Sequence, residues 1–162
     1  KTVQIIFNMF RHRPAELFFR EAQARQVGIL ARVPLASGLL TGKMTRETAF
    51  SADDHRQYNR EGESFDRGET FSGVDYEVGL EAAARLASVL PSEVSLPAAA
   101  LAWVASRPGD TSVIPGARNV AQARANAEAA GLIDGGWDLA AFDAAVHEVY
   151  DNLLRSAVHP LW

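Results

Sequence analysis

The residues best suited to chemistry lie in two short segments, each of which follows a predicted buried strand. In residues 112–126, an apolar run leads into a Pro-Gly turn and then a helix, with Arg118, Gln122 and Asn126 at its start. Backbone N–H groups at such a turn, together with the positive end of the helix dipole, favour a phosphate or an anionic nucleotide. The four-residue spacing predicts that the three polar side chains share one helix face.

The second segment covers residues 31–43, where Pro34 and Gly38 end a strand and Lys43 follows. Its Gly-Leu-Leu-Thr-Gly-Lys run is similar to a phosphate-binding P-loop. However, one residue is missing between the glycines, and Met44 stands where Ser or Thr is required. We therefore reject a P-loop. Lys43 is expected either to attract a phosphate as a point charge or to be an ordinary solvated lysine.

Other chemistries have weaker support. Ser37 has no Gly-x-Ser-x-Gly frame and no evident base, so nucleophilic catalysis is not expected. Asp53 and Asp54 are adjacent in a loop and are expected to be solvated. The histidines lack metal-ligand spacing and are expected to be structural or solvated. These are His12, His55, His147 and His159.

Apolar runs with β-branched residues alternate with helical patterns along the chain. Strands are predicted at 3–7, 27–31 and 111–114, and helices at 15–26, 76–90, 95–105, 119–130 and 138–152. This alternation predicts parallel βα units, whose ligands gather at the carboxyl ends of the strands. The candidate polar residues cluster toward all three strand ends, with Gln4 and Asn8 belonging to the first strand. Three strands cannot close a barrel, so two sheet edges are expected to lack a partner.

Two segments have no clear period. Residues 45–73 are polar and broken by glycines, and a loop of this length in a compact domain is typical of a lid or binding loop. Residues 153–162 are expected to be an irregular tail. Trp103, in an alanine-rich helix, is expected in the core.

Composition narrows the function classes. The 162 residues carry a net charge of −4, so the basic stripe that nucleic acids require is not expected. There is no run of 18 apolar residues and no secretory pattern, so neither a membrane span nor export is expected. The absence of cysteine excludes disulfides and thiolate chemistry and fits a cytoplasmic location. The start at Lys1, directly in a strand-like run, suggests a cut or a gap.

Residues 3–8, 31–43 and 113–126 together resemble the aldo-keto reductase family, in the family's order and with suitable separations, and the resemblance covers essentially the whole chain. The family is a (β/α)8 TIM barrel that moves hydride between NADPH and a carbonyl. The resemblance implies an α/β fold that is the C-terminal part of this barrel, with strands six to eight as three parallel βα units and an extra C-terminal helix. Residues 1–162 would then be one partial domain.

The resemblance also implies a cofactor site. Gln4 matches the glutamine that binds the nicotinamide carboxamide, and Arg32 stands where many members stack an aromatic ring on the nicotinamide. Residues matching the loop around the pyrophosphate are Pro34, Leu35, Ser37, Gly38 and Lys43. Residues matching the adenosine segment are Gly116, Arg118, Gln122 and Asn126. Ala125 departs from the glutamate that many members carry.

The family's catalytic tyrosine, aspartate, lysine and histidine come from the first half of the barrel, and none is matched here. Tyr58, Tyr76 and Tyr150 have the wrong surroundings. We therefore expect the cofactor-binding portion of an NADPH-dependent reductase of aldehydes or ketones, inactive alone. It would be completed by the missing N-terminal half or by a second copy. The alternatives are a catalytically silent, nucleotide-sensing regulatory subunit and a half-barrel structural domain without a ligand.

Overall fold

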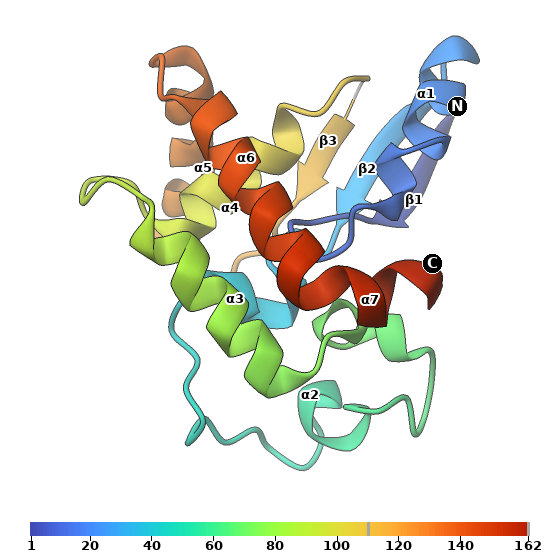
Figure 1. Cartoon of the computed structure of the whole chain (residues 1–162), viewed down its shortest axis with the longest axis vertical. Coiled ribbons are helices and arrows are strands. Elements are labelled where there is room, and N and C mark those ends of the chain that lie inside the picture. The colour runs from blue at the N-terminus through green and yellow to red at the C-terminus, as the bar shows by residue number, and fades with distance from the viewer. Residues whose placement is uncertain (110, 162) are drawn as a thin grey trace.

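Three strands form one parallel sheet in the order β1-β2-β3, so all three run toward the same end of the molecule (Figure 1). The computed structural model describes residues 1–109 and 111–161. The strands are β1 (Thr2–Ile6), β2 (Gly28–Arg32) and β3 (Thr111–Ile114). In the register, Ile6 lies beside Arg32 and Arg32 beside Ile114. The predicted α/β class with parallel strands is confirmed.

Helices connect and cover the strands. They are α1 (Phe18–Ala24), α2 (His55–Tyr58), α3 (Tyr76–Ser88), α4 (Leu96–Ala105), α5 (Val120–Asp134), α6 (Leu139–Val149) and α7 (Arg155–Val158). From α2 to α6, each helix begins after a residue whose side chain accepts a backbone N–H of the first turn, which fixes where the helix starts. These caps are Asp54, Asp75, Ser95, Asn119 and Asp138.

The core lies between the sheet and α4. Nearly every residue of α4 is buried, and its alanines allow close packing against β3, α3 and α5. Trp103 of this helix is in the core as expected. Its ring stacks on Phe7 with centroids 5.3 Å apart, and its Nε1 donates to Asp143 at 2.6 Å.

The two faces of the sheet differ in exposure. Ile29 and Ala31 of the central strand point into the core and are buried. The alternate positions on the outer strands, Gln4, Ser112 and Ile114, are exposed. Side chains alternate between the two faces along a strand, so these buried and exposed positions belong to opposite faces of the sheet. The helices therefore cover one face and leave much of the other open.

Several predicted boundaries were wrong. Pro14 lies in a separate 3-10 turn, Arg13–Ala15, so α1 begins at Phe18. Strands β1 and β2 are each displaced by one residue from the predicted ranges. Helix α5 continues through Gly131 to Asp134 and ends at Gly135, so the glycine that follows residue 130 does not stop it.

The C-terminal segment is helical rather than irregular. After α6, a π-helical turn over Tyr150–Leu154 leads into α7 and a 3-10 turn over His159–Leu161. Tyr150, Leu154 and Val158 are four residues apart and buried, so one apolar stripe holds the segment on the core. Trp162 lies outside the described residues.

The polar segment, residues 45–73, gathers at the end of the molecule toward which the strands run (Figure 1). It contains α2 and two 3-10 turns, Arg67–Glu69 and Phe71–Gly73. Within the described part of the chain, no helix is both long and apolar enough to cross a membrane.

Candidate functional site

A groove of about 870 Å³ opens beside the carboxyl ends of β2 and β3. Its walls come from the turns that follow these strands, from the starts of α4 and α5, and from part of the polar segment. Most of the residues proposed from the sequence to hold a cofactor lie along it. These are Pro34, Leu35, Ser37, Gly38, Lys43, Gly116, Arg118, Gln122 and Asn126, and Ala125 lies among them.

The groove is positively charged although the chain is acidic. Its described lining residues include Lys43, Arg56 and Arg118 and no aspartate or glutamate. The chain as a whole carries a net charge of −4. Asp54, outside the lining, is paired with Arg56, so the net positive charge of the groove comes from Lys43 and Arg118. Cations in a concave site concentrate the local positive potential, so the groove favours an anionic ligand.

The turn after β2 has an unusual backbone. Val33, Ala36 and Ser37 have φ values of 55°, 47° and 55°, and Gly38 follows with φ 104°. Non-glycine residues seldom adopt positive φ, and for a β-branched residue such as Val33 the conformation is a true outlier. Strain of about 1–3 kcal/mol per residue persists only where the surroundings enforce it, and it is commonly found at ligand sites.

Gly38 is required by this turn. L side chains rarely adopt its φ of 104°, so any substitution there is strained, and a Cβ atom would also displace the flexible end of the Met44 side chain, whose Cε would lie 2.5 Å from it. The absence of a side chain lets residues 37–44 fold tightly along the groove wall.

Arg56 is a groove residue that sequence reasoning missed. Its Nε and Nη2 donate to the two carboxylate oxygens of Asp54 at 2.9 and 2.5 Å, and its Nη1 lies 3.4 Å from the carbonyl oxygen of Ser37. The guanidinium carbon lies 4.6 Å from the ring centroid of Phe50. The hydrogen bonds to Arg56 lower the pKa of Asp54 well below its usual range. The prediction that Asp54 is a solvated charge was therefore wrong.

The start of α5 differs from the predicted shared face. Asn119 caps the helix, so Arg118 precedes it instead of belonging to it. The side chains of Gln122 and Asn126 turn back to the preceding loop. Gln122 Oε1 accepts the backbone N–H of Arg118 at 2.7 Å, and Asn126 Nδ2 donates to the carbonyl of Gly116 at 2.8 Å. Both amides thus fix the loop after β3.

The remaining two predicted site residues lie outside the groove lining. Gln4 is exposed in β1, on the more open face of the sheet. Arg32, at the end of β2, forms a two-pronged ion pair with Glu69 at 2.6 and 2.5 Å, with both side chains about one-third exposed. The hydrogen bonds from Arg32 lower the pKa of Glu69. Stacking of Arg32 on a nicotinamide remains a prediction.

Residues 66–73, which we call the strap, are fastened to the strand ends at three points. Glu69 pairs with Arg32, and the backbone N–H of Phe71 donates to Ser37 Oγ at 3.0 Å. Ser72 Oγ accepts from Asn8 Nδ2 at 2.7 Å. The strap therefore connects the polar segment to the residues that shape the groove.

His12 is a core residue. Its ring stacks on Tyr150 with centroids 3.8 Å apart, and its Nε2 lies 2.8 Å from the carbonyl oxygen of Met9. Burial, reinforced by the nearby His147, lowers the pKa of His12 to about 3. Within residues 1–109 and 111–161, no group of three or more His, Cys, Asp or Glu residues could hold a metal ion.

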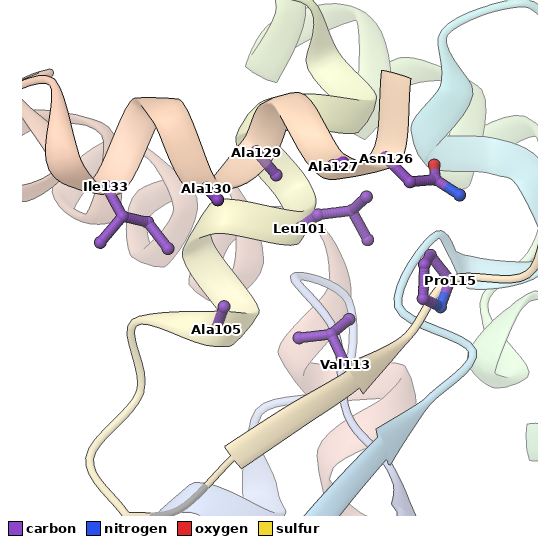
Figure 2. Close-up of a pocket in the computed structure, with 9 residues that line it drawn as sticks. All are labelled: Leu101, Ala105, Val113, Pro115, Asn126, Ala127, Ala129, Ala130 and Ile133. Atoms are coloured by element: carbon purple, nitrogen blue, oxygen red, sulfur yellow. The ribbon is translucent and has the colours of Figure 1, made fainter. Parts of the chain in front are cut away.

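A smaller cavity of about 230 Å³ lies between α4, β3 and α5. Figure 2 shows side chains from these three elements facing one space, among them Leu101, Val113 and Ile133. Pro115 and Asn126 border both this cavity and the groove. The lining is apolar apart from Asn126, so the charged groove is the stronger candidate for an anionic ligand.

Comparisons with known proteins agree with this architecture. The family model described as the aldo/keto reductase family matches residues 1–134. The aldo-keto reductase YhdN of Bacillus subtilis (strain 168) is 28% identical in a match of 162 positions that covers 98% of this chain and 45% of that protein.

Solved structures agree as well. The glycerol dehydrogenase AKR11B4 from Gluconobacter oxydans has a TM-score of 0.67 and 27% identity, covering 94% of this chain and 43% of its own. The holo form of aldo-keto reductase AKR11C1 from Bacillus halodurans, at 17% identity and a TM-score of 0.59, shares the fold over 91% of this chain and 42% of its own. The chain thus spans less than half the length of these relatives.

Proposed function

The chain belongs to the aldo/keto reductase family, and we propose that its groove binds the phosphate and adenosine parts of NADPH. The observation that carries the proposal is the convergence of three cations on one groove that no described acidic side chain lines. A volume of about 870 Å³ lies within the range of small-molecule and cofactor sites, roughly 300–1,000 Å³.

Each part of the groove suits a part of the dinucleotide. Lys43 and Arg56, beside the strained turn after β2, would hold the pyrophosphate. Arg118, in the loop that Gln122 and Asn126 fix, would hold the 2′-phosphate of the adenosine, which NADH lacks. Gln4 is proposed to bind the nicotinamide carboxamide in the complete protein.

NADPH, when bound, supplies a hydride. We propose that the complete protein uses it to reduce an aldehyde or a ketone to an alcohol. The proton donor would come from the part of the relatives' length that this chain does not span. The chain by itself would then bind cofactor without completing the reduction. The polar segment, residues 45–73, and the C-terminal segment, residues 153–162, would border the carbonyl substrate.

The test is a titration of the intact protein with NADPH and with NADH, in which binding is measured by fluorescence or calorimetry. Replacing Arg118 by alanine is expected to weaken NADPH binding about tenfold, because a charge-assisted contact to a phosphate is lost. The preference for NADPH over NADH should shrink by the same factor.

Arg124 provides a matched control because it is an exposed arginine of α5 outside the groove lining. Its replacement by alanine should leave both affinities within about twofold of the wild type. Equal effects of the two alanine variants, or no NADPH binding by the wild type, would refute the proposed function.

We further propose that β1 and β3 pair through their outer edges with the other half of a (β/α)8 barrel or with a second copy of this chain. Within the described residues, each of these strands has one edge without a partner. Parallel sheets are normally covered on both faces, and an exposed edge presents unpaired backbone groups that tend to pair with another strand. The 162-residue chain produced alone should therefore self-associate or unfold without cooperativity. A monodisperse, cooperatively unfolding monomer in light scattering and thermal denaturation would contradict this.

A further inference from the structure

Asn8 is a fully buried polar residue that joins three segments of the chain. It lies just beyond β1 with no exposed surface. Its Nδ2 donates to the carbonyl of Val33 at 2.8 Å and to Ser72 Oγ at 2.7 Å. Its Oδ1 accepts the backbone N–H of Phe10 at 2.9 Å. The amide group therefore links the loop after β1, the turn after β2 and the strap.

Both partners of the Nδ2 group have strained backbones. Val33 has φ 55° and Ser72 has φ 60°, in the left-handed region that favours glycine. Val33 is less stable there than most residues, because it is β-branched and precedes Pro34. Such conformations persist only where surrounding contacts enforce them. One contact that holds Val33 in this conformation is the hydrogen bond that its carbonyl oxygen accepts from Asn8.

The turn that Asn8 holds is part of the groove. Val33, Pro34 and Leu35 line it in succession, and Ser37 and Gly38 follow. Asn8 itself does not line the groove, so any effect on a ligand must pass through this backbone. We propose that Asn8 is a positioning residue that holds the turn after β2 in its binding conformation and couples it to the strap. This rests on the proposed function of the groove.

The test compares Asn8→Ala with matched variants at Val33 in the intact protein, using NADPH as the probe. With valine at position 33, Asn8→Ala should raise the dissociation constant for NADPH about tenfold or more, because the strained turn relaxes. Glycine adopts positive φ without strain. In a Val33→Gly background, Asn8→Ala should therefore raise the dissociation constant for NADPH only about threefold or less. A Val33→Ala background, which removes the side chain without freeing φ, should show nearly the full loss.

Asn59 is the control for a buried amide that contacts the strap, through Thr70, but not the turn after β2. It is also fully buried. Its Oδ1 accepts the backbone N–H groups of Ser64 and Phe65, and its Nδ2 donates to the hydroxyl of Thr70. None of these residues lines the groove. Asn59→Ala should lower the melting temperature about as much as Asn8→Ala but should change NADPH affinity far less.

Amide hydrogen exchange without cofactor gives a readout that is independent of binding. Exchange at residues 35–38 should accelerate in Asn8→Ala and not in Asn59→Ala. Equal loss of affinity in the valine and glycine backgrounds, or unchanged exchange at these residues, would overturn the positioning role. If the wild type binds NADPH while Asn8→Ala changes only the melting temperature, this inference fails and the proposed function stands. If the wild type binds no NADPH, both fail.

Discussion

Replacing Arg56 by alanine is expected to raise the dissociation constant for NADPH about thirtyfold, corresponding to about 2 kcal/mol of binding free energy. The guanidinium lines the groove beneath the turn that carries Ser37 and Gly38. It is held in place by two hydrogen bonds to Asp54 and by the ring of Phe50. An arginine already fixed in this way loses little conformational freedom when it binds a phosphate, so its contribution should exceed that of a mobile surface lysine.

Arg60 offers a control with nearly the same surroundings. Its guanidinium lies 4.8 Å from the ring centroid of Tyr76 and 5.7 Å from that of Phe50, but it does not line the groove. Arg60→Ala should therefore destabilise the polar segment and leave NADPH affinity nearly unchanged. Arg56→Lys should recover only part of the loss, because an ammonium cannot form the two-pronged pair with Asp54. Calorimetric titration of these variants provides the comparison. An Arg56→Ala protein that binds NADPH as tightly as Arg60→Ala would contradict this role.

Acidification should destabilise the fold through His12. The folded protein holds this imidazole neutral, because burial lowers its pKa from 6.5 to about 3. Below pH 6.5 the unfolded chain takes up a proton on His12 that the folded chain does not. The unfolding free energy is therefore fully retained above pH 6.5 and falls as the pH drops toward 3. The loss attributable to His12 should reach about 2 kcal/mol at pH 5 and about 3 kcal/mol at pH 4.

Denaturant unfolding of the intact protein between pH 4 and pH 8 measures this loss. Because carboxylates also titrate in this range, the decisive quantity is the difference from His12→Phe, which keeps a ring against Tyr150 but cannot take up a proton. The variant should lose about 2 kcal/mol less than the wild type between pH 7 and pH 5. Parallel pH profiles for wild type and His12→Phe would rule out His12 as the cause.

The elements that could be predicted from the sequence are those whose local pattern agrees with their packing. Strand β3 is a short apolar run with turn signals on both sides, and α3 and α4 have clear caps at Asp75 and Ser95. The turns after β2 and β3 are likewise marked by proline and glycine. Because parallel strands bring their carboxyl ends together, the convergence of Lys43 and Asn126 on one groove follows from the order of these elements.

What could not be predicted depends on contacts between distant residues. Arg56 and Glu69 lie in a polar segment without periodicity, and their places are set by partners such as Phe50 and Arg32. The positive φ of Val33 is enforced in part by Asn8, 25 residues earlier, and no local signal at a valine indicates it. The final helical segment was missed because its apolar residues stabilise it only against the core.

One groove at the ends of β2 and β3 is proposed to bind a phosphorylated dinucleotide. Amide hydrogen exchange of the intact protein, with and without saturating NADPH, tests it most directly. We expect NADPH to slow exchange in residues 33–44 and 114–126 and to leave α6 unchanged. Exchange that NADPH slows elsewhere in the protein, with these two segments unaffected, would contradict the account.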